Sequence, residues 1–143
     1  MNTPKIIELE SLARQAGAIL RAGFYREKQI TFKSAIDLVT DADHQAEDFL
    51  IRSIRQHYAD HSIVAEESGQ LSGVEDSTWF IDPMDGTVNF AHNFPVFAVS
   101  IGYAQNGVMQ MGVVFDPIRE ECFSAQRGGG GEADGAGELG ARG

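Results

Sequence analysis

The chain has 143 residues, 43% of them hydrophobic and 22% charged, which is enough for one globular domain with a hydrophobic core. Its formal net charge of −10 disfavours a partner with a phosphate backbone, so we expect no nucleic-acid binding. The single cysteine, Cys122, excludes an intramolecular disulfide and a thiolate metal site.

The first part of the chain predicts two amphipathic helices. Apolar residues recur at helical spacing over residues 4–25, with Pro4 near the first turn. This start lacks the apolar core of a signal peptide, and no apolar run approaches the roughly 20 residues that span a bilayer. We therefore expect a cytoplasmic protein without a membrane partner. After a short extended or looped segment at residues 33–39, Thr40 reads as the N-cap of a second helix that ends at about Tyr58.

The remainder predicts a sheet of short, mostly apolar strands. The expected strands are residues 62–65, 78–81, 96–103, 108–115 and 121–125, with a polar loop at residues 69–76. Asn106-Gly107 is typical of a type I′ hairpin turn between two of them. Two helices followed by a mainly antiparallel or mixed sheet indicate an α+β fold.

The apolar strands also predict an exposed surface. Strands that are nearly continuous in apolar residues are usually covered on both faces of their sheet. Two helices can cover only one face. We therefore expect an exposed apolar patch and a tendency of the chain to self-associate.

The composition changes abruptly after Arg127. Residues 128–143 hold half of the chain's 16 glycines, no aromatic or β-branched residue, and a single large apolar side chain, Leu139. Such a segment cannot bury enough apolar surface to offset its ordering entropy. We therefore expect a folded domain over residues 1–127 and a disordered tail over residues 128–143.

The most informative segment is Asp82-Pro83-Met84-Asp85-Gly86-Thr87, which follows the expected strand at residues 78–81. Its two carboxylates are hard oxygen ligands that suit Mg²⁺ or Mn²⁺. Pro83 fixes the backbone of a tight turn, and Gly86 allows a ligand to approach the backbone. Thr87 is expected to open a short helix whose free amides could bind an anion. A plain acidic β-turn is the alternative interpretation of this segment alone.

Other acidic residues are also clustered along the chain. Glu66 and Glu67 follow one expected strand as Asp82 follows the next, and two strand ends can bring such groups together. Asp43 would lie in the first turn of the second helix, where the helix dipole alone explains an acid. A bound cation and a solvated acidic face are both open interpretations of the whole set. Its members are Asp37, Asp41, Asp43, Glu47, Asp48, Glu66, Glu67, Asp82 and Asp85.

Three segments resemble the inositol monophosphatase family, the Mg²⁺-dependent, lithium-sensitive phosphatases. They are Lys33-Ser34 with residues 37–43, then residues 65–68, then residues 79–90 running on through Phe94-Pro95 and residues 98–102. The resemblance covers roughly residues 5 to 128. It implies the first half of that family's sugar-phosphatase fold, with two N-terminal helices packed on the sheet.

The resemblance also implies a metal site. Its ligands would be Glu66, Asp82, the backbone carbonyl of Met84, and Asp85, with Asp82 bridging two ions. The cofactor would be Mg²⁺, with Mn²⁺ as an alternative.

The resemblance implies catalytic and substrate-binding roles as well. Asp43, Glu66 and Thr87 would orient the attacking water. The amides of Gly86 and Thr87 would bind the phosphate, and Asp85 would approach the substrate's hydroxyls. The implied reaction is hydrolysis of a small phosphate monoester, myo-inositol monophosphate or a related polyol or sugar phosphate, by metal-activated water.

The chain departs from the family in its length. Members are about twice as long, often form homodimers, and carry in their second half a further metal-ligand Asp in a Trp-Asp-x-Ala-Ala-Gly motif. Here the only tryptophan, Trp79, belongs to the first half. We therefore expect a truncated or frameshifted member, with a natural half-length relative or a deliberately shortened one as alternatives. The alternative function is an inactive remnant that binds metal at most.

Overall fold

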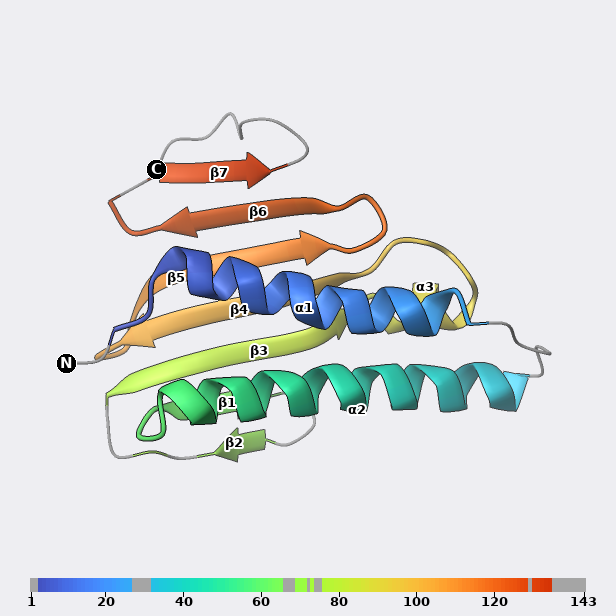
Figure 1. Cartoon of the computed structure of the whole chain (residues 1–143), viewed down its shortest axis with the longest axis horizontal. Coiled ribbons are helices and arrows are strands. Elements are labelled where there is room, and N and C mark those ends of the chain that lie inside the picture. Colours follow the sequence, from blue (N-terminus) through green and yellow to red (C-terminus); the bar gives the residue numbers. More distant parts are fainter. Residues whose placement is uncertain are drawn as a thin grey trace.

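The computed structural model describes residues 3–26, 32–65, 69–71, 73, 76–128 and 130–134, with the backbone alone for 32–40, 71 and 130–134. Within these residues, helices α1 (Ile6–Phe24) and α2 (Phe32–His57) lie side by side on one face of a seven-stranded sheet (Figure 1). A short helix, α3 (Thr87–Ala91), follows the third strand. The described part confirms the predicted α+β architecture.

The sheet is mixed, as predicted. Its order is β2-β1-β3-β4-β5-β6-β7, and β1 and β3 are parallel while every other neighbouring pair is antiparallel. The strands are β1 (Ser62–Ala65), β2 (Gly69–Leu71), β3 (Ser77–Asp85), β4 (Ala98–Gln105), β5 (Val108–Asp116), β6 (Glu121–Gln126) and β7 (Gly130–Asp134).

The turn between β4 and β5 is the predicted type I′ hairpin. Asn106 has φ 52° and Gly107 has φ 78°, so both central residues adopt the left-handed conformation that this turn requires.

Helix α2 begins eight residues earlier than predicted, at Phe32 instead of Thr40. Residues 33–39 are helical, so the expected extended or looped segment is wrong, and Thr40 is not an N-cap. The physical reason is that Phe32, Ile36 and Val39 continue the helical spacing of apolar residues that leads into the buried Ala42. Asp43 therefore lies in the helix interior, and a first-turn dipole effect no longer explains it.

Two edge strands were also missed. β2 occupies part of the expected polar loop and pairs with β1, and β7 occupies residues 130–134 of the expected disordered tail and pairs with β6. Pairing at a sheet edge satisfies backbone N–H and C=O groups and needs no apolar side chain, so composition gave no signal for it. The prediction of disorder is wrong for residues 130–134, while residues 129 and 135–143 lie outside the described residues.

The core lies between the helices and one face of the sheet. Strand residues on that face alternate with residues on the opposite face, so β1, β3, β4, β5 and β6 each carry a row of buried residues on the helix face. On the opposite face, Phe80 is 41% exposed and Val114 is 42% exposed. The main buried side chains are Leu9, Leu20, Leu50, Ile54, Ile63, Trp79, Ile81, Val99, Ile101, Tyr103, Val113 and Phe115.

Polar groups tie the helices to the sheet at the end where β3 begins. The Trp79 indole N–H donates to His61 Nδ1 at 3.0 Å, so that nitrogen accepts and carries no proton. The Tyr58 hydroxyl donates to the Glu8 carboxylate at 2.7 Å, and the Tyr103 hydroxyl donates to Ser77 Oγ at 3.0 Å. These bonds connect α1, the end of α2, β3 and β4.

The close contact of α1 with β5 generates a test. A Cβ on Gly17 would lie 2.5 Å from the buried Phe115 ring, whereas a Cβ on Gly112 would meet nothing within 4 Å. We expect Gly17→Ala to lower the free energy of unfolding by about 1–3 kcal/mol through overpacking. Gly112→Ala should have no such cost. Urea unfolding of both variants measures the difference, and equal stabilities would contradict the packing described here.

The Tyr58–Glu8 contact predicts a pH dependence. Burial, together with the hydrogen bond to Glu8, raises the pKa of the Tyr58 phenol well above its usual range. The unfolded chain releases this proton near pH 10 while the folded chain keeps it, so the stability from this contact is complete below about pH 10 and falls as pH rises further.

We expect Tyr58→Phe to cost about 1–2 kcal/mol at neutral pH, with the gap to the original protein closing above about pH 10. Chemical denaturation at several pH values measures this gap. A gap that stays constant with pH would contradict the assignment.

Candidate functional site

The acidic segment lies at the end of β3, where the strand contains one extra residue. Asp82 pairs with Ser100 and Asp85 pairs with Ala98, so three steps along β3 match two steps along β4. This irregularity is a β-bulge, and Pro83 fits inside it because a bulged residue need not donate to the ladder. The Met84 N–H donates instead to Asp82 Oδ1 at 3.3 Å.

The bulge puts both carboxylates on one face of the sheet. Residues three apart on a regular strand point to opposite faces. Here Asp82 and Asp85 pair with Ser100 and Ala98, which are two residues apart and share a face of β4. That face is the one opposite the two long helices, because it also carries the exposed Phe80.

Gly86 connects the bulge to α3. It has φ 100° and ψ 34° as the N-cap residue of α3, a conformation that glycine adopts without strain. A Cβ at this position would lie 2.8 Å from the carbonyl oxygen of Val96. The structure therefore confirms that Thr87 opens a short helix and gives Gly86 a packing role.

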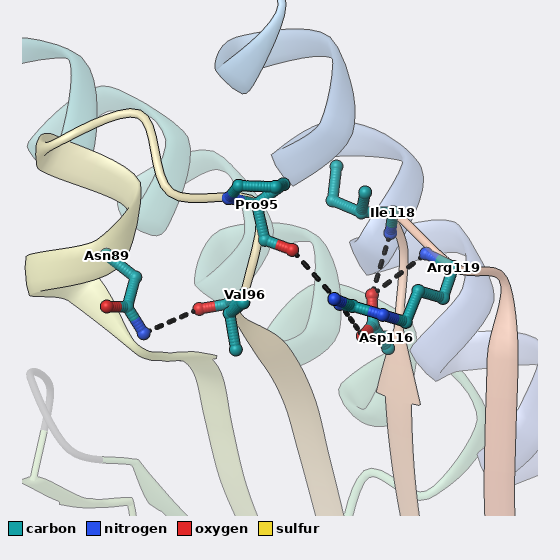
Figure 2. A network of polar contacts seen from close by, with 6 residues as sticks. All are labelled: Asn89, Pro95, Val96, Asp116, Ile118 and Arg119. Atoms are coloured by element: carbon teal, nitrogen blue, oxygen red, sulfur yellow. Dashed lines mark hydrogen bonds and ion pairs between the residues drawn. The ribbon is translucent and has the colours of Figure 1, made fainter.

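The loop at residues 92–97 holds α3 in place (Figure 2). The Asn89 side chain donates to the Val96 carbonyl at 2.9 Å, and the Phe94 N–H donates to the Asn89 carbonyl at 2.8 Å. Inside, the Phe90 ring packs edge-on against Phe97 at a centroid distance of 5.0 Å.

A second set of bonds fixes the same loop from the turn between β5 and β6. The Arg119 guanidinium donates to the Pro95 carbonyl at 3.1 Å and to Asp116 Oδ2 at 3.0 Å (Figure 2). Asp116 Oδ1 accepts from the N–H groups of Ile118 and Arg119 at 2.9 Å and 3.0 Å. Sequence reasoning missed Asn89, Asp116 and Arg119, although Asp116-Pro117 carries the signal of a side-chain-capped turn.

Asp43 is buried on α2, the long helix that contacts α3. A Cβ on Gly23 would lie 3.1 Å from the Cβ of the adjacent Ala42 and 3.6 Å from the Phe90 ring. This turn of α2 therefore packs beside the helix that Gly86 begins. Glu47, one turn further along, is also buried.

The expected metal ligands are only partly within the described residues. The described part brings Asp82, the Met84 backbone and Asp85 together at the bulge, and their oxygen donors suit Mg²⁺. Glu66 lies outside the described residues. Among those that are described, no three His, Cys, Asp or Glu side chains gather closely enough to hold a metal ion.

The sequence of the chain matches the family model described as "Inositol monophosphatase family" over residues 2–139. The chain belongs to the inositol monophosphatase family. No helix within the described residues combines the length and the apolar character needed to cross a membrane.

Individual relatives agree with the family assignment. The chain is 47% identical over 121 residues to a Nus factor SuhB of Pasteurella multocida, covering 82% of this chain and 45% of the relative. It is 43% identical over 125 residues to human inositol monophosphatase 1, covering 84% and 45%. The solved inositol monophosphatase from Anabaena superposes with a TM-score of 0.76 at 39% identity, covering 90% of this chain and 46% of that one. The chain thus spans about half the length of the curated relatives it matches.

The packing around Gly86 predicts that substitution of Gly86 destabilises the protein more than substitution of Gly128. Gly86 and Gly128 both have positive φ, but a Cβ would meet a backbone carbonyl only at Gly86 and nothing within 4 Å at Gly128. We expect Gly128→Ala to cost about 1 kcal/mol for the left-handed backbone alone. Gly86→Ala should cost about 1–3 kcal/mol more, because the loop at residues 92–97 must also move. Thermal and urea unfolding measure both losses of stability. A loss for Gly86→Ala that is no larger than the loss for Gly128→Ala would refute this packing.

Proposed function

We propose that this chain supplies the metal- and phosphate-binding half of a Mg²⁺-dependent phosphomonoesterase acting on myo-inositol monophosphate or a related polyol or sugar phosphate. The observation that carries the proposal is the bulge that puts Asp82 and Asp85 on one face of the sheet, directly before Gly86 and Thr87. Family membership gives this arrangement its chemical meaning.

The proposed metal ligands are Glu66, Asp82, the Met84 carbonyl and Asp85. These residues would hold a divalent ion, which would neutralise the phosphate dianion and lower the pKa of a bound water. The side chains must be held rigidly for this purpose, and the bulge, with the buried Pro83 at its centre, supports their backbone.

The remaining residues bind and orient the reactants. The amides of Gly86 and Thr87, at the start of α3, are proposed to bind the phosphate oxygens, and Asp85 the hydroxyls of the alcohol. Asp43, Thr87 and Glu66 are proposed to orient the attacking water for in-line displacement. The loop that carries Val96 supports these groups indirectly, because it fixes the orientation of α3.

A second candidate function is a metal-binding remnant without catalytic turnover. The observation in its favour is that the matched region covers only 45% of the human and Pasteurella relatives. Only the first candidate has a small phosphate ester as its partner. For both we propose a cytoplasmic location and no partner among nucleic acids or membranes.

Asp82→Asn tests the proposed function. We expect the original chain to release phosphate from inositol 1-phosphate only when Mg²⁺ is present, with inhibition by Li⁺. Asp82→Asn should reduce this release by at least about 100-fold, because it removes a charge that fixes the metal. Asp76→Asn is the matched control, since Asp76 is an exposed acid at the opposite end of β3.

Calorimetric titration with Mg²⁺ separates the two candidates. Binding together with phosphate release supports the phosphatase. Binding that Asp82→Asn abolishes, without release from any of a panel of inositol and sugar phosphates, supports the remnant. Absence of both would overturn the proposed site in this chain.

A further inference from the structure

The loop at residues 92–97 packs against the start of α3 although most of it is exposed. Each of residues 92–96 is exposed, and only Phe97 is buried. The Val96 carbonyl oxygen nevertheless lies so close to Gly86 that a Cβ on Gly86 would be 2.8 Å from it. A segment with so little buried surface opens easily unless polar bonds hold it. The position of the loop against α3 therefore depends on its hydrogen bonds.

Two consecutive carbonyl groups of this loop are held from different parts of the chain (Figure 2). The Val96 carbonyl accepts from the Asn89 side chain at 2.9 Å, and the Pro95 carbonyl accepts from the Arg119 guanidinium at 3.1 Å. Asn89 belongs to α3, so its bond joins the loop to the helix alone. Of these two bonds, only the one from Arg119 fixes the loop and α3 relative to the sheet.

Arg119 lies on a turn that is itself anchored to the core. Asp116 Oδ1 accepts from the N–H groups of Ile118 and Arg119, which closes the turn. Pro117 is buried, and a Cβ on Gly17 of α1 would lie 3.1 Å from its side chain. Nη1 of Arg119 donates both to Asp116 Oδ2, at 3.0 Å, and to the loop. The carboxylate thus holds the guanidinium where it reaches the Pro95 carbonyl.

We propose that Arg119 is a positioning residue for phosphate binding. By holding the Pro95 carbonyl, it keeps the loop against Gly86 and fixes the direction of the N–H groups of Gly86 and Thr87. The phosphate part of this inference rests on the proposed function, whereas the effect of Arg119 on α3 needs no ligand. The alternative is that Arg119, whose side chain is 51% exposed, attracts the anion by its charge alone.

Amide hydrogen exchange tests the effect on α3 without any ligand. The Phe90 and Phe94 N–H groups donate to main-chain carbonyls at the start and in the middle of α3, at 3.0 Å and 2.8 Å. Arg119→Met keeps the apolar stem of the side chain and removes its donors. We expect it to speed exchange of these two amides about three- to tenfold, which is what one hydrogen bond from a charged group contributes.

The matched control is Arg127→Met. Arg127 is also an exposed arginine that donates to a main-chain carbonyl, that of Met109 at 3.1 Å, but it follows β6 at the other end of the sheet. Its substitution should leave exchange in α3 unchanged. Amides in the paired strands β3 and β4 should exchange at the original rates in both variants, which separates local loosening from loss of folding.

Calorimetric titration with inorganic phosphate, in the presence of Mg²⁺, tests the consequence for binding. We expect Arg119→Met to weaken phosphate binding about three- to tenfold. The affinity for Mg²⁺ should not change, because Asp82 and Asp85 lie on β3 and not on the loop. Arg127→Met should alter neither affinity.

Asp116→Asn separates positioning from attraction by charge. The amide oxygen can still accept from the N–H groups that close the turn, but the amide nitrogen no longer holds the guanidinium. Arg119 then keeps its charge and loses its fixed position. Positioning predicts that phosphate binds more weakly to Asp116→Asn, whereas attraction by charge predicts tighter binding, because a negative charge has been removed.

Four results would overturn the proposal. They are unchanged exchange at Phe90 and Phe94 in Arg119→Met, faster exchange that Arg127→Met reproduces, unchanged phosphate affinity in Arg119→Met, and tighter phosphate binding by Asp116→Asn. If the original chain binds no phosphate while exchange in Arg119→Met is faster, the proposed function fails. Arg119 would then support α3 alone, without a role in binding.

Discussion

The pairing of β3 with β4 is the contact on which both the core and the candidate site depend. Before the bulge, Trp79 and Ile81 face the helices and are buried in the core. At the bulge, one extra residue changes the phase of the strand, so Asp85 shares a face with Asp82 instead of pointing toward the helices. The apolar pattern in the first half of β3 fixes the register of its pairing with β4. The bulge then puts Asp85 on the same face of the sheet as Asp82.

The two faces of the sheet contribute differently to the placement of Asp82 and Asp85. The helix face supplies rigidity, because the rings of Phe24, Phe90 and Phe97 pack together beneath α3. The open face supplies the carboxylates, and there Asp85 is exposed to water. In a high dielectric, charges interact weakly and bound water exchanges freely, whereas phosphate chemistry profits from a water-excluded site. The described residues thus give the two carboxylates of the proposed site a rigid backbone but little of the enclosure around them.

Much of the fold could be predicted from local signals in the sequence. The buried stripe of α1, the Asn106-Gly107 turn and the helix start at Thr87 each depend on residues that are neighbours along the chain. The features that were missed depend on distant partners. The edge strands β2 and β7 are held by backbone pairing, and the bulge exists only relative to β4. The early start of α2 had a local signal in the helical spacing of its apolar residues. This signal was overlooked because Thr40 resembles an N-cap residue.

The sequence indicated which residues to examine as a candidate site, but not which residues hold them in place. Asp82, Asp85 and Gly86 lie within five positions of one another, so their motif can be recognised in the sequence itself. The bonds from Asn89 and Arg119 to the loop at residues 92–97 join positions up to 24 residues apart, so no spacing rule reveals them. The metal-binding, catalytic and substrate-binding roles of all these residues, including Asp43, Glu66, Met84 and Thr87, remain predictions.

The hairpin turn at Asn106-Gly107 has a consequence for the order in which the molecule assembles. A two-residue turn brings β4 and β5 together over a very short loop, and such hairpins close in about 1–10 μs. The parallel pairing of β1 with β3 spans a longer separation and forms more slowly, since its loop must close first. We therefore expect β4 and β5 to serve as the template onto which β3 docks. The bulge, and with it the spacing of the two carboxylates, would then form only when β3 docks on this template.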